Sequence, residues 1–169
     1  MASQNDEILE QVVSDSCVSL FDDYKLPLAR VQYGQLAESE PLLFCGVVGF
    51  SGEHMRGTLL LATSKEPLGR TSPTTDSSLR EWIAELSNQL LGRIKNKFLP
   101  RGVTLHLSTP IVLRGQHIAP VSHAELVPFA WQCDGGCVCV WFDAEYAPTL
   151  DLSQVAEEVG VEEGTSMLF

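Results

Sequence analysis

The spacing of apolar residues predicts two long amphipathic helices. The longer pattern runs from Asp76 to Leu99, where hydrophobic side chains recur at helical intervals. These side chains are Leu79, Trp82, Ile83, Leu86, Leu90, Ile94 and Phe98. Ser78 followed three residues later by Glu81 is a capping-box pattern, so we expect the helix to begin there. The other helix is expected from about Asp6 to Phe21, and Pro27 prevents its continuation.

The remaining apolar runs predict strands. They cover about residues 28–36, 42–50, 58–63, 103–108, 110–115, 124–132 and 137–143. The run at 42–50 is apolar throughout, which is typical of a central strand, and the segment 58–63 should pair with it as a hairpin. Two prolines and a glycine predict a loop from Lys65 to Thr75. The pattern as a whole indicates an α/β domain of the α+β type with a mainly antiparallel sheet.

Composition limits the class of protein. A chain of 169 residues accommodates one domain, which we place at residues 1–150, followed by an acidic tail at 151–169 that is a short helix or disordered. The net charge of −11 argues against nucleic acid or an anionic membrane as the main partner. No apolar run is long enough to span a bilayer, and the first residues lack a signal-peptide pattern, so we expect a cytoplasmic protein.

One face of the longer helix carries the candidate functional residues. At about 100° per residue, Glu85, Asn88 and Gly92 all fall opposite the apolar stripe. A glycine inside a helix costs about 1 kcal/mol relative to alanine, and no core packing explains this one. Two interpretations follow from the residues alone: an ordinary solvated helix face, or a patch to which another molecule comes close.

Cysteines and histidines suggest no second site. Cys133, Cys137 and Cys139 surround an Asp-Gly-Gly turn, but a zinc site would require a fourth ligand and a recognised spacing. Structural cysteines are therefore the favoured interpretation over metal or redox function, with Cys137 and Cys139 on one strand face and Cys133 near them. The histidines form no helical metal pair, and we expect no metal site.

The helix motif resembles that of a known family. Glu85-Leu86-Ser87-Asn88-Gln89-Leu90-Leu91-Gly92 is similar to the Glu-x-x-Asn-x-x-x-Gly motif of the CheC/CheX/FliY phosphatases, and of CheX in particular. The segments 46–52 and 57–61 before the helix and 102–115 after it resemble the family's strands, in the same order. The resemblance covers about residues 6–145 and implies a single CheC-like domain, in which the first helix packs on the motif helix.

The resemblance implies an enzyme that acts on another protein. Members hydrolyse the aspartyl phosphate of CheY-like receiver domains, in chemotaxis or related two-component signalling. Carried over to this chain, Glu85 would pair with the receiver's active-site lysine, and Asn88 would orient a water for in-line attack on phosphorus. Glu81 and Gly92 are candidates for partner contacts. The chain would need no cofactor of its own, because Mg²⁺ belongs to the receiver.

Two features differ from the family pattern, and other hypotheses stay open. Ser87 occupies a position that is often glycine in the family, and the Lys65 to Thr75 connection looks irregular where members carry a helix. The resemblance also allows a homodimer through sheet edges. The main alternative is a non-catalytic CheX-like domain that binds or scaffolds receivers. A small-molecule enzyme built on the histidines or cysteines has little support.

Overall fold

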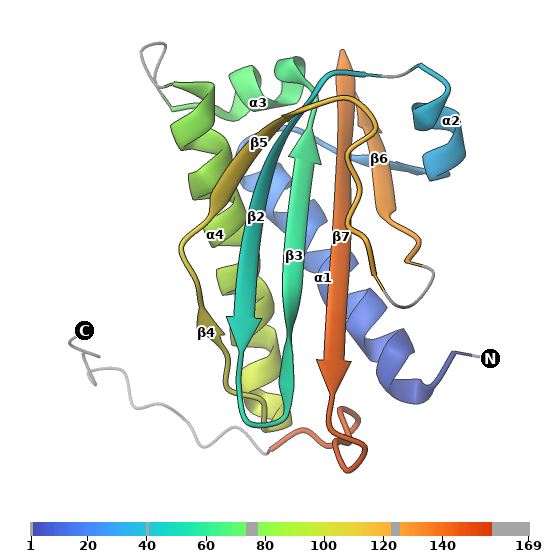
Figure 1. The fold of residues 1–169 in the computed structure, drawn as a ribbon, viewed down its shortest axis with the longest axis vertical. Coiled ribbons are helices and arrows are strands. Elements are labelled where there is room, and N and C mark those ends of the chain that lie inside the picture. The colour runs from blue at the N-terminus through green and yellow to red at the C-terminus, as the bar shows by residue number, and fades with distance from the viewer. Residues whose placement is uncertain (1, 40, 74–77, 123–125, 157–169) are drawn as a thin grey trace.

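The fold is an antiparallel sheet with two long helices on one face (Figure 1). The computed structural model describes residues 2–39, 41–73, 78–122 and 126–156. Its helices are α1 (Gln4–Asp23), α2 (Tyr33–Ala37), α3 (Lys65–Thr71), α4 (Leu79–Phe98) and the 3-10 turn η1 (Leu99–Arg101). Its strands are β1 (Ala29–Val31), β2 (Leu43–Ser51), β3 (Met55–Thr63), β4 (His106–Leu107), β5 (Ile111–Gly115), β6 (Phe129–Cys133) and β7 (Gly136–Tyr146). The predicted α/β class is confirmed.

The strand order is β1-β6-β7-β3-β2-β4. The strand β5 also pairs with β2, at residues 43–47, whereas β4 pairs with residues 50–51. Each pairing of the described strands is antiparallel. The β2–β3 hairpin runs from Phe44 opposite Thr63 to Ser51 opposite Arg56, as the apolar run at 42–50 predicted. The β6–β7 hairpin turns through Asp134 and Gly135, whose φ of 83° favours glycine.

Two apolar clusters lie on opposite faces of the sheet. The larger joins the sheet to α1 and α4 and includes Cys17, Phe21, Leu86 and Ile94. The smaller lies on the other face and includes Cys45, Leu60 and Trp141, with Leu36 of α2 against it. In Figure 1 the helices α1 and α4 run side by side across the sheet. The motif helix is therefore held on one flank by α1 and from beneath by the sheet.

The ends of α4 follow the predicted signals. Ser78 is the N-cap, and its Oγ accepts a hydrogen bond from the Glu81 N–H at 3.1 Å. At the other end η1 continues α4 through Pro100, and Gly102 ends it with a φ of 81°. The long helix therefore begins and ends where the sequence predicted.

Two local predictions were wrong. The expected loop from Lys65 is the helix α3, because Pro67 lies in its first turn, where a missing N–H does no harm, and Leu68 and Thr71 are buried. The irregular connection that set the chain apart from the family pattern is thus a helix. The extended segment expected over 28–36 is the short strand β1 followed by α2, since Leu36 is buried against the second apolar cluster.

Residues 151–156 are tied to the domain and contain no helix. Leu152 is fully buried, its N–H donates to Asn5 Oδ1 at 2.9 Å, and the Ala156 N–H donates to the Pro100 carbonyl at 2.7 Å. The packed region therefore extends past residue 150, which we had predicted as the end of the domain. Residues 157–169 lie outside the described residues. No helix in the described part of the chain is long and apolar enough to cross a membrane.

Candidate functional site

The candidate site is the outward stripe of α4, defined here as Glu81, Glu85, Asn88 and Gly92. All four lie within about 60° of one another around the helix and span about 16 Å along its axis. Glu81 and Glu85 are exposed, and Asn88 and Gly92 are half-buried. The sequence placed Glu85, Asn88 and Gly92 on one exposed face, and the structure brings them together there with Glu81.

The polar side chains of the stripe differ in what they bind. Glu85 Oε1 accepts a hydrogen bond from Gln89 Nε2 at 3.1 Å. The Asn88 amide makes no hydrogen bond to any other residue that the structure describes. A Cβ added to Gly92 would meet no atom within 4 Å. The stripe thus presents the hydrogen-bonded carboxylate of Glu85, the unbonded amide of Asn88 and, at Gly92, a position on the helix surface with no side chain.

Small residues set how closely α4 approaches the sheet. Ser87 is fully buried, and its Oγ donates to the Ile83 carbonyl at 2.7 Å. Beneath it lies Gly46 of β2, where an added Cβ would come within 2.0 Å of Ser87 Oγ and 2.9 Å of Ser87 Cβ. Serine therefore serves here as the small residue that close packing requires. It does so by bonding its hydroxyl back to its own helix.

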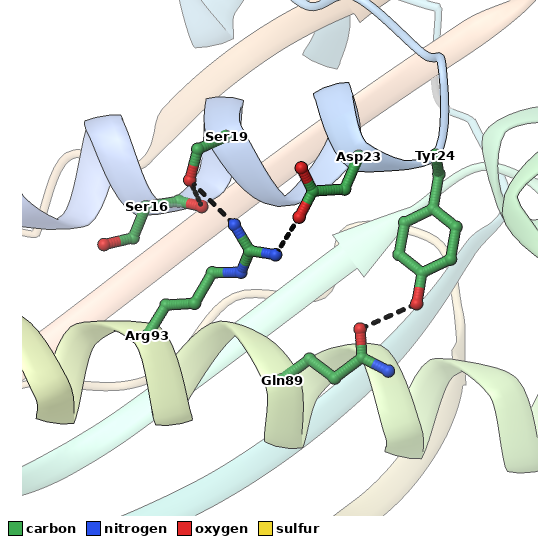
Figure 2. A network of polar contacts seen from close by, with 6 residues as sticks. All are labelled: Ser16, Ser19, Asp23, Tyr24, Gln89 and Arg93. Atoms are coloured by element: carbon green, nitrogen blue, oxygen red, sulfur yellow. Dashed lines mark hydrogen bonds and ion pairs between the residues drawn. The ribbon is translucent and has the colours of Figure 1, made fainter. Parts of the chain in front are cut away.

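The flank of α4 that faces α1 carries a polar seam (Figure 2). Tyr24 OH, just after α1, donates to Gln89 Oε1 at 2.8 Å. Arg93 forms an ion pair with Asp23 and donates through Nη1 to Ser19 Oγ at 3.1 Å. Gln89 directly follows Asn88 in the sequence, and Arg93 directly follows Gly92. In each pair the first residue lies on the outward stripe and the second faces α1.

Sequence reasoning missed Gln89 and Tyr24. The spacing of Glu85 and Gln89 is i, i+4, which alone signals a side-chain pair on a helix. Tyr24 carries no such signal, since it contacts Gln89 from 65 positions away. The support behind Glu85 is therefore readable only in part from the sequence.

The protein-family model described as chemotaxis phosphatase CheX matches residues 44–130 of this chain. The matched range contains the sheet segment under Ser87 and the whole outward stripe. The chain belongs to the CheX family. No curated protein sequence matches it. The CheX family assignment confirms the resemblance that the motif indicated.

Solved structures of CheX and CheC-like proteins share the fold. CheX from Vibrio vulnificus is 14% identical, with a TM-score of 0.66, over 81% of this chain and 96% of its own. A CheC-like superfamily protein from Shewanella sp. PV-4 is 18% identical, with a TM-score of 0.65, over 81% of this chain and 97% of its own. The CheX–CheY–BeF₃–Mg²⁺ complex from Borrelia burgdorferi gives 14% identity, a TM-score of 0.61 and coverages of 80% and 96%.

The cysteines of this CheX-family chain lie apart from the stripe. Cys137 and Cys139 share the second apolar cluster, as predicted, but Cys133 packs against the first cluster on the opposite face. The reason is register: Gln132 is the partner of Cys137, so the next residue points the other way. Burial raises the pKa of Cys45 to about 12 and that of Cys133 to about 11, which keeps both as thiols at neutral pH.

Cys137 differs from the other cysteines. A hydrogen bond from Cys139, together with the Ser64 hydroxyl, lowers the pKa of Cys137, while the pKa of Cys139 is raised. Both side chains are buried, away from the outward stripe. Within the described ranges, no cluster of three or more histidine, cysteine or acidic residues could hold a metal ion. Of the histidines, His54, His106 and His117 are exposed, and His123 lies outside those ranges.

Proposed function

We propose that the chain is a phosphatase that hydrolyses the aspartyl phosphate of a CheY-like receiver domain. The observation that carries this proposal is the free Asn88 amide, one turn from Glu85 on the exposed face of the family's motif helix. An amide without an intramolecular partner is available to a water or to a second protein. A domain that only bound receivers would have no need of it.

The roles follow from the chemistry of phosphoryl transfer. Such reactions depend on positioning and charge stabilisation more than on covalent help from the catalyst. In our proposal the Glu85 carboxylate forms an ion pair with the receiver's active-site lysine and so fixes how the two proteins dock. Asn88 then enters the receiver's site and orients the attacking water, while Mg²⁺ is held by the receiver. Glu81 and Gly92 extend the contact along the helix in both directions.

The relative from Borrelia burgdorferi supports the choice of partner. That CheX was solved in a complex with CheY, BeF₃ and Mg²⁺. Beryllofluoride stands in for a phosphoryl group, so the complex represents a phosphorylated receiver held by a CheX domain. The shared fold, together with the resemblance of this chain's helix motif to that of the family, supports a phosphorylated receiver as the substrate class.

The decisive experiment compares the decay of phosphorylated receivers with wild-type protein, Asn88→Ala and Glu85→Ala. The receivers come from the genome that encodes this chain, and each is phosphorylated with a small-molecule phosphodonor. We expect wild-type protein to accelerate decay of its cognate receiver. Asn88→Ala should lose about 100-fold of that acceleration, because the water is no longer oriented, and still bind the beryllofluoride-loaded receiver. Glu85→Ala should weaken both.

Binding without hydrolysis would favour a different function. If wild-type protein binds a beryllofluoride-loaded receiver but leaves the decay of every phosphorylated receiver unchanged, the chain is a receiver-binding domain. If Asn88→Ala is as active as wild type, the water-orienting role is wrong. Neither outcome depends on folding, provided that the variants unfold at or above the wild-type temperature, which is expected because alanine propagates a helix better than asparagine or glutamate.

A further inference from the structure

Two consecutive hydrogen bonds connect the end of α1 to the Glu85 carboxylate. Tyr24 OH donates to Gln89 Oε1 at 2.8 Å, and Gln89 Nε2 donates to Glu85 Oε1 at 3.1 Å. Figure 2 shows the first of these bonds, with the Gln89 amide reaching across from α4 to the tyrosine. The stripe residue is thus held by a neighbour on its own helix, and that neighbour is held by another element.

The order of the bonds determines which way the Gln89 amide points. Its oxygen can only accept and its nitrogen can only donate, whereas an ionised carboxylate only accepts. Because Glu85 can only accept, the NH₂ group of Gln89 must face it, and Oε1 is left for the tyrosine hydroxyl, which can donate or accept. With the amide reversed, its oxygen would face a carboxylate oxygen and repel it. The carboxylate therefore sets the orientation of the Gln89 amide, and Tyr24 holds the amide in that orientation by donating to Oε1.

Tyr24 is itself anchored in the packed interior. Its ring meets Trp82 edge-on, with centroids 5.4 Å apart and an interplanar angle of 85°. Trp82 Nε1 donates in turn to the buried Thr71 Oγ1 at 2.8 Å, at the end of α3. The support of Glu85 therefore leads back to the core instead of ending in a mobile surface side chain.

We propose that Gln89 is a positioning residue for Glu85 and that the hydrogen bond from Tyr24 holds Gln89 in place. The inference rests on the proposed function, in which Glu85 receives a cationic side chain of a receiver. Gln89 occupies Oε1, and no hydrogen bond from a described residue reaches Oε2, which leaves that oxygen for the partner. Holding the carboxylate before docking removes the loss of rotamer freedom that an unsupported glutamate would suffer on binding.

The test measures binding to the beryllofluoride- and Mg²⁺-loaded receiver that wild-type protein dephosphorylates fastest. Tyr24→Phe keeps the ring against Trp82 and removes only the hydroxyl, and Gln89→Met keeps the length of the side chain. We expect each to weaken binding about threefold to tenfold, with a smaller change in the dephosphorylation rate of the saturated complex. Ser19→Ala is the matched control, since it removes another hydroxyl from the same seam without touching Glu85.

A second background separates positioning from general damage. Both substitutions are repeated in Glu85→Ala, where we expect no further loss, because the group that they act through is gone. A loss of the same size in that background, or an equal loss in Ser19→Ala, would show that the bonds only stabilise the fold.

The two proposals fail in different ways. If wild-type protein accelerates decay and Tyr24→Phe and Gln89→Met bind as wild type does, this inference alone is wrong. If wild-type protein neither binds nor dephosphorylates any receiver, the proposed function is wrong, and the inference falls with it.

Discussion

Two flanks of α4 use polar residues in opposite ways. On the flank toward α1, Arg93 is bonded to α1 and Gln89 to Tyr24, the residue that follows α1. On the outward stripe, the residues directly before them are Asn88, whose amide has no described partner, and Gly92, which opens onto empty space. One flank satisfies its groups within the chain, and the other carries an amide and an open glycine for which we propose a second molecule as the partner.

This difference separates residues that hold the fold from residues that lower its stability. Inside a helix, glycine costs about 1 kcal/mol relative to alanine, and asparagine also propagates a helix poorly. The seam toward α1 offsets this, because each hydrogen bond there contributes about 0.5–1.5 kcal/mol. A weak stretch of helix can therefore remain straight and exposed. We therefore expect three kinds of substitution to differ in their effects on stability and on receiver binding: those that displace the whole helix, those on the flank toward α1, and those on the outward stripe.

The largest effect on stability is expected at Gly46, because its contact with Ser87 sets the position of the whole of α4. Gly46→Ala would place a Cβ 2.0 Å from Ser87 Oγ and 3.1 Å from the Ile83 carbonyl. We expect α4 to be pushed from the sheet and the free energy of unfolding to fall by about 1–3 kcal/mol, measured by urea denaturation. Receiver binding should fall with it, because both flanks move.

A second substitution tests that contact directly. Adding Ser87→Gly to Gly46→Ala removes the hydroxymethyl group that clashes, so the double variant should be more stable than the sum of the two single effects predicts. Strict additivity would mean that the clash is relieved elsewhere and that the spacing of α4 does not depend on this pair.

The next effect is confined to the flank toward α1. Arg93→Met keeps the aliphatic stem and removes the ion pair with Asp23 and the bond to Ser19. We expect a loss of about 1 kcal/mol in the free energy of unfolding, with little change in the dephosphorylation rate. Arg56→Met is the control, because the Arg56–Glu145 pair is largely exposed on the sheet and should contribute less. An equal loss from the two variants would contradict a special role for the seam.

Much of this architecture was predictable because it depends on local pattern. Residues 79–98 repeat apolar side chains at helical spacing, and Ser78 and Gly102 mark the two ends, so the helix and its exposed face follow from sequence. The motif that carries Glu85 and Asn88 lies within that one element. No long-range contact was needed to place the two on the same face.

The missed features depend on contacts between distant parts of the chain. The helix α3 was taken for a loop because Pro67, Gly69 and Pro73 are typical of turns, whereas burial of Leu68 stabilises the helix. Cys133 was expected near Cys137 and Cys139 across the turn, and only the strand register shows that it faces the opposite side of the sheet. The bond from Tyr24 to Gln89 could not be inferred at all, since it arises from how α1 lies against α4.

The smallest effect on stability, and the sharpest test of the comparison, is expected at Gly92. Gly92→Ala places a methyl group in open space and improves helix propensity, so the free energy of unfolding should rise by about 0.5–1 kcal/mol. If the outward stripe is left for a receiver, the same methyl group obstructs the approach of the partner, and binding to the beryllofluoride-loaded receiver should weaken. Thermal unfolding and receiver binding are measured on the same preparation.

Gly69→Ala in α3 is the matched control, because a Cβ there also meets no atom within 4 Å, yet the residue lies off the stripe. Gains in stability for both variants with weaker binding only for Gly92→Ala would mean that this glycine is kept for the partner. Unchanged binding would remove Gly92 from the docking surface and shorten that surface to the two turns between Glu81 and Asn88.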